Sequence, residues 1–196
     1  MKKLLWCFLI FIGFFNAFGQ SDFHGKAFVF PRETANSYVS LKAQLKKALN
    51  AFTVCVYFYS ELAPTRVGGP ELEFKVYENA ASPTHLCATW ESASGIAELW
   101  VNGKPRVRKS LQKGYTVGSD ASIILGQDQD SFGGDFDAKQ SLVGDIGDVN
   151  MWDFVLSPEM IRSVYRGGTN SPNMLNWRQL MFSANGDVYI KPKLWV

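Results

Sequence analysis

Residues 51–62 read AFTVCVYFYSEL, and their side chains alternate between two sets. Successive side chains of an extended chain point to opposite faces, so a period of two predicts a half-buried β-strand. The segment is rich in Phe, Val and Tyr, which favour strands. One face would carry Phe52, Val54, Val56 and Phe58, and the other Thr53, Cys55, Tyr57 and Tyr59.

Other parts of the chain repeat this pattern at short intervals. Asn102-Gly103 is a strong signal for a hairpin turn between two strands. Short strands separated by turn residues are typical of an all-β sandwich, and no repeat or linker divides the chain, so we expect one domain. The further predicted strands are ELEFKVYE (71–78), GIAELWVNGKPRV (95–107), ASIILG (121–126) and GDIGDVNMWD (144–153).

One short helix is predicted within LSPEMIRSVYRGG, residues 156–168. Ser157 suits the N-cap, Pro158 the first turn and Gly167 the position after the last turn. Its apolar stripe of Met160, Ile161 and Val164 would lie on a sheet.

The N-terminal residues 1–19 have the pattern of a secretory signal peptide, with an uncleaved anchor as the alternative. Two lysines precede an apolar run that is short for a membrane span, and small residues follow it. Its removal would leave residues 20–196 as the domain and lower the formal net charge from +2 to 0. We therefore expect a secreted, extracellular protein with no further transmembrane segment, and no binding to nucleic acid.

Cys55 and Cys87 remain after residues 1–19 are removed. An even pair in an oxidising compartment favours a disulfide, worth about 3–4 kcal/mol by the chain-entropy estimate. Two buried free thiols are the alternative. His24 and His85 are the two histidines, and we expect structural roles for both.

Residues 126–140, GQDQDSFGGDFDAKQ, hold four aspartates within ten positions. Carboxylate and amide oxygens are the ligands that Ca²⁺ prefers, so the loop is either a cation site or a solvated turn. It is no EF-hand, because Phe132 and Lys139 occupy positions that need ligands. Asp128 and Asp137 could also act as the acid pair of a glycosidase. Acids grouped in one loop are more typical of cation ligands, so we expect no enzymatic activity.

The segment HLCATWES at 85–92 fits the pentraxin signature His-x-Cys-x-Thr/Ser-Trp-x-Thr/Ser at every fixed position. The chain resembles this family from about Ala17 to its closing KPKLWV. The resemblance implies a two-sheet, lectin-like jelly roll, a Cys55–Cys87 disulfide and a ring of five identical subunits. It also implies an acute-phase, pattern-recognition protein of innate immunity that binds phosphocholine on microbes and damaged cells.

The resemblance further implies which residues bind ligands. Glu71 would face the choline ammonium, and Asn102, Lys104 and Tyr165 would lie on the face that engages complement and immunoglobulin receptors and so promotes opsonisation. Asn102 stands where an Asp is expected, and Asp128 and Asp137 stand where relatives have Glu. A double Ca²⁺ site would use Asp128, the carbonyl of Gln129, Asp130, Asp137 and Gln140.

The resemblance is interrupted between Arg66 and Val67, where family members carry roughly thirty more residues. These supply strands, an Asp-Asn pair of the calcium site and the aromatic wall of the choline pocket. Here APTRVGGPE forms a short link instead. The alternative functions are therefore a truncated isoform with impaired calcium and ligand binding, and an adhesion-type sandwich without metal.

Overall fold

The computed structural model describes residues 22–43, 45–60, 66–69, 72–75 and 82–195 of the chain. Within them it forms thirteen strands, one α-helix and two short 3-10 helices. The elements are β1 Lys26–Phe30, β2 Tyr38–Leu41, β3 Ala51–Tyr59, β4 Arg66–Gly69, β5 Leu72–Lys75, β6 Thr84–Glu91, β7 Ile96–Val101, β8 Lys104–Pro105, β9 Lys109–Ser110, β10 Ile123–Leu125, η1 Ala138–Gln140, β11 Gly144–Trp152, α1 Pro158–Tyr165, η2 Trp177–Gln179, β12 Phe182–Asn185 and β13 Tyr189–Pro192.

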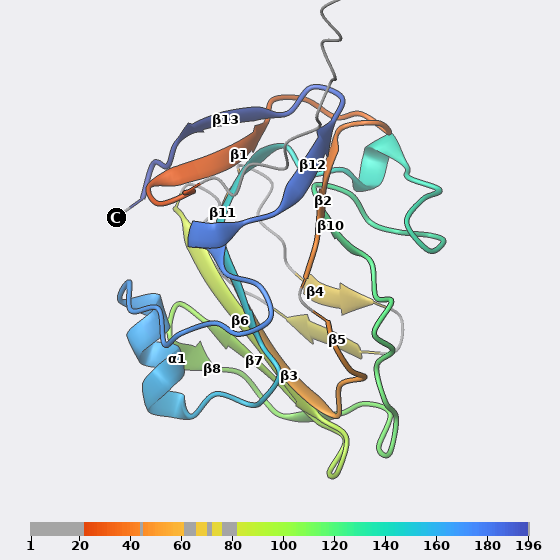
Figure 1. Cartoon of the computed structure of the whole chain (residues 1–196), viewed down its shortest axis with the longest axis vertical. Helices are drawn as coiled ribbons and strands as arrows, with labels where there is room; N and C mark the ends of the chain where they lie inside the picture. The colour runs from red at the N-terminus through yellow and green to blue at the C-terminus, as the bar shows by residue number, and fades with distance from the viewer. Residues whose placement is uncertain (1–21, 44, 61–65, 70–71, 76–81, 196) are drawn as a thin grey trace, which may run out of the picture.

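Two antiparallel sheets and a hairpin make up the molecule (Figure 1). The large sheet has the strand order β13-β1-β11-β3-β6-β7-β8, and β9 also pairs with β7. The small sheet has the order β10-β2-β12, and among the described strands β4 pairs only with β5. This is the predicted all-β, jelly-roll sandwich with one short α-helix.

The space between the two sheets is filled by aromatic and aliphatic side chains. Phe28 from β1 and Val39 from β2 are both fully buried in one cluster. Phe23 lies with its ring 5.1 Å from Phe28 and 5.4 Å from Trp177. A neighbouring cluster joins Phe74 of the β4–β5 hairpin to Trp90 and its neighbours on β6 and β7. The hairpin therefore covers the part of the large sheet that the small sheet does not reach.

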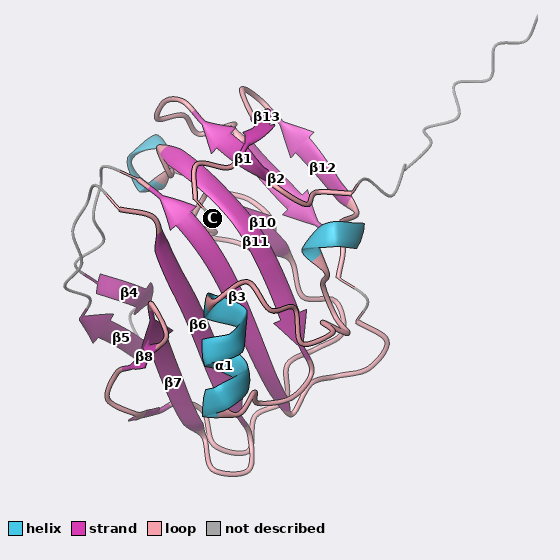
Figure 2. Cartoon of the chain, turned by 90° about the vertical axis from the view of Figure 1, so that its left-hand side faces the viewer, coloured by secondary structure: helices cyan, strands magenta, loops and turns pink. Residues whose placement is uncertain are grey.

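The outer face of the large sheet is also covered, because α1 lies across β3 and β6 (Figure 2). Ile161 and Val164 of α1 pack with Cys55, Cys87 and further apolar residues. The predicted strand is present as β3, and most of its residues are partly buried, but Thr53 and Cys55, on the face opposite the sandwich interior, are fully buried. The alternation had indicated a solvated second face, and the helix takes the place of that solvent.

The ends of the predicted elements largely agree with the structure. Ser157 Oγ accepts a hydrogen bond from Met160 N and caps α1, and Gly167 follows the helix at a positive φ of 88°. The turn at Asn102-Gly103 has two positive φ angles, 50° and 72°, as the favoured hairpin turn requires. The predicted strands 95–107, 121–126 and 144–153 contain β7 with β8, β10 and β11.

The predicted short link around the interruption is wrong in one respect. Arg66–Gly69 forms β4, and it pairs in antiparallel register with Leu72–Lys75. Of the predicted strand 71–78, only the β5 residues are described; Glu71 and residues 76–78 lie outside the described residues, as does the predicted signal peptide 1–19.

We predict that the hydroxyl of Thr53 stabilises the connection from β11 to α1. Thr53 Oγ1 donates to Phe154 O (2.9 Å) and accepts from Leu156 N (2.9 Å), and Leu156 is buried. Thr53→Val would leave that buried N–H unpaired and should lower the free energy of unfolding by about 1–3 kcal/mol. Urea denaturation measures this change.

Thr116→Val is the matched control, because Thr116 is exposed and its hydroxyl donates to the side chain of Asn50. It should change stability by less than about 0.5 kcal/mol. Equal effects of the two variants would contradict the role of Thr53.

Candidate cation site and the opposite face

The acidic loop leaves the small sheet at β10 and returns to the large sheet at β11, and its base is closed tightly. Leu142 N donates to Gly126 O at 2.9 Å. Gly126 has a φ of 91°, and a Cβ there would overlap the ring of Phe30. Only glycine satisfies both conditions without strain. The loop therefore begins at a fixed point on the core.

Gln127 holds the start of the loop against the segment between β1 and β2. Its side-chain amide nitrogen donates to Thr34 O (2.6 Å) and to Ser37 O (3.0 Å). Its other amide atom, Oε1, is buried and accepts no hydrogen bond from the described residues. A buried carbonyl oxygen without a partner is a candidate acceptor for a cation or a water.

The tip of the loop is ordered by its own polar groups. Gln129 Oε1 accepts from Gly133 N at 3.0 Å, and Ser131 and Gly134 exchange backbone hydrogen bonds. The side chain of Phe132 is 76% exposed at this turn. Asp137 caps η1, since its Oδ1 accepts from Lys139 N at 3.0 Å. One oxygen of Asp137 is thus used to shape the loop.

An open hollow of about 470 Å³ lies beside the loop. Asp128 and Gln140, two of the five predicted calcium ligands, line it together with Gln127. Ser60, which directly follows β3, also lines the hollow. Asp128 Oδ1 accepts from Gln129 N at 3.0 Å, so its second oxygen is directed elsewhere.

The set of potential ligand atoms around this hollow suits one hard cation. It consists only of carboxylate, amide and hydroxyl oxygens, and one of them, Gln127 Oε1, is buried without a partner among the described residues. Asp130, Asp137 and Gln129 do not line the same hollow. No three carboxylates of the described residues come within 4.8 Å of one another. The structure therefore brings two of the five predicted ligands together and leaves three apart.

The predicted complement-face residues gather where α1 ends against the β7–β8 turn. Asn102 Oδ1 accepts from His85 N at 2.9 Å, and a Cβ on Gly103 would press on the ring of Tyr165. Tyr165 is 38% exposed, and its carbonyl accepts from Tyr57 Oη at 2.6 Å. Lys104 is exposed on the same turn. The structure brings these three predicted residues together.

A second group beside α1 was missed by the sequence analysis. Asp148 Oδ2 accepts from Lys193 Nζ and from Trp195 Nε1, each at 2.9 Å. Asp148 has a φ of 50° and lies within the register shift between Gly147 and Asn150. A non-glycine residue at positive φ in a strand marks a β-bulge, which period-two patterns do not reveal.

His85 lies under this group, in contact with Tyr57, whose ring centroid is 4.6 Å away. It is 1% exposed, and it borders a hollow of about 80 Å³ that Asp148 and Lys193 also line. Burial lowers the pKa of His85 from 6.5 to about 4, although the nearby Asp148 carboxylate acts in the opposite direction. The imidazole is therefore neutral at physiological pH.

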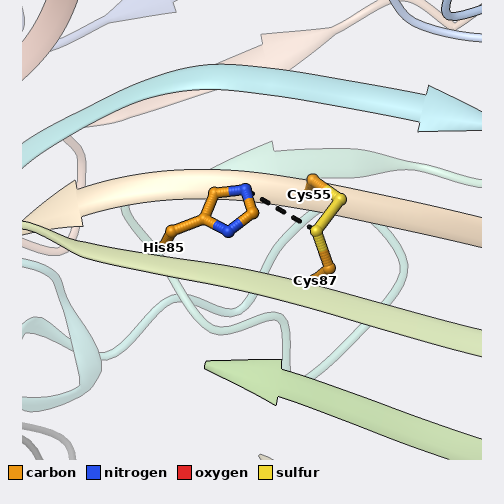
Figure 3. A group of neighbouring side chains, drawn as sticks. All are labelled: Cys55, His85 and Cys87. Carbon is orange, nitrogen blue, oxygen red and sulfur yellow. Dashed lines mark hydrogen bonds between the residues drawn. A yellow bond between two sulfur atoms is a disulfide. The ribbon is translucent and has the colours of Figure 1, made fainter. Parts of the chain in front are cut away.

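Cys55 and Cys87 are joined by the predicted disulfide, directly across β3 and β6. His85 Nε2 lies 3.6 Å from Cys87 Sγ (Figure 3). Among the described residues, these three form the one group of His, Cys, Asp and Glu side chains whose ligand atoms lie within 4.8 Å of one another.

Comparison with known proteins places this arrangement in a family. The model of the pentaxin (pentraxin) family matches residues 26–67 and 64–192. The chain belongs to the pentaxin family. The two matched segments meet at residues 64–67, which is where the sequence analysis places the interruption.

Relatives of this pentaxin cover it from end to end. It is 59% identical to C-reactive protein of Mus musculus and 56% identical to that of Homo sapiens, with 100% of each chain covered. Serum amyloid P-component of Rattus norvegicus is 45% identical and covers 99% of this chain, which covers 97% of it. The C-reactive protein alignments span 224 positions against 196 residues here, a difference of 28.

Solved structures agree on the fold. A heptameric, serum amyloid P-like pentraxin from Limulus polyphemus superposes with a TM-score of 0.74 at 17% identity, covering 88% of this chain and 97% of that one. A putative carbohydrate-binding protein from Bacteroides ovatus gives a TM-score of 0.62 over 86% of this chain and 60% of that one, at 14% identity. At such identities the likeness concerns the architecture alone.

Within the described residues of this pentaxin, no helix has the length and apolar character needed to cross a membrane.

We predict that His85 makes this pentaxin less stable in mild acid. Unfolding exposes the ring and restores a pKa near 6.5, whereas the folded value is about 4. Between these values the unfolded state binds the additional proton. The contribution of His85 to the free energy of unfolding is therefore complete above pH 6.5. As the pH falls from there toward 4, this free energy decreases by about 1.4 kcal/mol per pH unit.

Urea denaturation across this range, for the wild type and His85→Gln, isolates the contribution. The variant should lose less stability on acidification than the wild type, while His24→Gln, which changes an exposed histidine, should match the wild type. Identical pH profiles for the wild type and His85→Gln would contradict the prediction.

Proposed function

We propose that this pentaxin is a secreted pattern-recognition protein that binds phosphocholine on microbes and damaged cells through a Ca²⁺ ion at the 126–140 loop. The observation that carries the proposal is the 56–59% identity with C-reactive protein of two mammals over the full chain, together with the hollow that Asp128 and Gln140 both line. The protein would act by binding, as a non-enzymatic component of the acute-phase response.

The chain's own residues would hold the ion and orient the ligand. Asp128 supplies a charged oxygen, Gln140 an amide oxygen, and Gln127 is fixed by its two bonds to Thr34 and Ser37. When bound, the ion supplies positive charge for the phosphate of phosphocholine. Glu71 would face the choline ammonium, and it lies outside the described residues.

A second candidate is a pentaxin with impaired calcium binding. It is favoured by the separation of Asp130 and Asp137 from the hollow and by the use of Asp137 Oδ1 as the cap of η1. Affinity for Ca²⁺ rises with the number of charged ligands around it. This candidate holds fewer ions than the two implied by the family resemblance, and holds them weakly. Calorimetric titration that finds two ions bound at micromolar concentration would contradict it.

We predict that binding to immobilised phosphocholine requires calcium and Asp128. The wild type should be retained in millimolar Ca²⁺ and released by EDTA. Asp128→Asn should weaken calcium binding by about tenfold or more, because it removes a charged oxygen from the ion. Surface plasmon resonance at a series of calcium concentrations measures both effects.

Asp120→Asn is the control, since Asp120 is exposed and lies outside the loop. It should bind as the wild type does. Retention of the wild type in EDTA at undiminished affinity would contradict the proposed function.

We further propose that the chain assembles as a homopentamer by joining opposite edges of its large sheet. β13 lies at one end of the strand order, where Tyr189 and Ile190 are 50% and 45% exposed. β8 lies at the other end, next to Val107, which is 78% exposed. Two different patches that pair head to tail generate a ring. Complement and immunoglobulin receptors would engage the face of Asn102, Lys104 and Tyr165.

Size-exclusion chromatography with light scattering should return the mass of five chains. Val107→Glu should shift the mass toward a single chain, because it places a charge on an apolar contact. A monomeric wild type would contradict the assembly.

A further inference from the structure

The imidazole of His85 lies beside the disulfide that joins β3 and β6. Cys55 and Cys87 are a directly opposed pair of the two strands, and His85 lies two residues before Cys87, so its side chain is on the same face. Figure 3 shows the ring turned with Nε2 toward the sulfur of Cys87, 3.6 Å away. All three side chains are buried.

The separation between the ligand atoms of His85 and Cys87 matches a soft-metal site. In tetrahedral zinc sites the Zn–S and Zn–N bonds are about 2.3 and 2.0 Å, which places sulfur and nitrogen ligands about 3.5 Å apart. His85 Nε2 and Cys87 Sγ already lie at that separation. Thiolate and imidazole together favour zinc and chemically similar ions over calcium. The ligand types are therefore opposite to those at the 126–140 loop.

The surroundings satisfy two further requirements of a metal site. Trp152, Ile161 and Val164 enclose the sulfur atoms in an apolar shell. His85 Nδ1 has no hydrogen-bond partner among the described residues, and His85 borders the hollow of about 80 Å³ beside α1. That volume can hold water, which can accept from the second ring nitrogen and so orient the ring.

We propose that reduction of the Cys55–Cys87 disulfide converts this group into a binding site for one zinc-type ion, held by the two thiolates and His85 Nε2. A phosphine or a dithiol supplies two electrons, and two protons complete the two thiols. The phosphine becomes its oxide with oxygen from water, or the dithiol becomes a disulfide. Binding of the ion then releases two thiol protons. This site is independent of the proposed function at the loop.

Cobalt(II) is the probe, because thiolate ligation of tetrahedral Co²⁺ gives intense absorption in the visible and near-ultraviolet range. The full chain is reduced with a phosphine, freed of reductant without oxygen, and checked by near-ultraviolet circular dichroism. Reduced wild-type protein should bind one Co²⁺ per chain, and Zn²⁺ should displace it. The oxidised protein should give no thiolate band.

Variants assign the ligands. His85→Gln should weaken Co²⁺ binding by about tenfold or more, because one of three protein ligands is lost. Cys87→Ser should lower the thiolate absorption to at most that of a one-sulfur site, and His24→Gln, at an exposed histidine, should leave binding unchanged.

Three results would overturn the proposal. Reduced, folded protein that binds no Co²⁺ excludes the site. Equal binding by the wild type and His85→Gln shows that the imidazole is not a ligand. Loss of the near-ultraviolet signal on reduction shows that the strands do not hold the group together without the disulfide. None of these results depends on calcium or phosphocholine.

Discussion

The pairing of β3 with β6 is the constraint on which the rest of the structure depends. Eight residue pairs join the two strands from Ala51↔Glu91 to Phe58↔Thr84, and a disulfide joins them at their middle. One face of the pair packs toward the sandwich interior and the other lies under α1 (Figure 2). Residues covered on both faces lose contact with water on both sides, and Thr53, Cys55 and Cys87 in the middle of this pair are fully buried. The interruption between Arg66 and Val67 lies outside it, which explains how a chain 28 residues shorter than its relatives' alignments keeps the family fold.

The same sheet separates two kinds of chemistry. Before the start of β11, the loop that begins at Gly126 offers exposed oxygen atoms, suited to a hard cation and a phosphate. On its outer face, α1 covers buried sulfur, imidazole and indole groups. Tyr165 and Asn102 lie at the border of that enclosed group. Changes in the loop and changes beneath α1 should therefore act on different properties of the protein.

Much of this could be predicted from the sequence, because strands and helix ends leave local signals. The alternation in residues 51–62 located β3, and Ser157, Pro158 and Gly167 delimited α1. Burial of the second face of β3 could not be predicted, since it depends on where a helix a hundred residues away packs. The roles of Gln127 and Asp148 were missed for a related reason, because each depends on a partner that is distant in the sequence. Gln127 bonds to Thr34, and Asp148 bonds to Lys193. The separation of the predicted calcium ligands likewise depends on the geometry of the loop, because Asp137 caps η1 and does not line the hollow.

Hydrogen–deuterium exchange of the purified protein, resolved by peptide, tests the central claim most directly. If the β3–β6 pair is the base of the fold, its amides should exchange only through global unfolding and be the slowest of the chain, together with those of β11. The β4–β5 hairpin, which pairs with no other strand of the part of the chain that the structure describes, should exchange through local opening at lower free energy. Exchange of the β3 and β6 amides as fast as that of the hairpin would contradict the account.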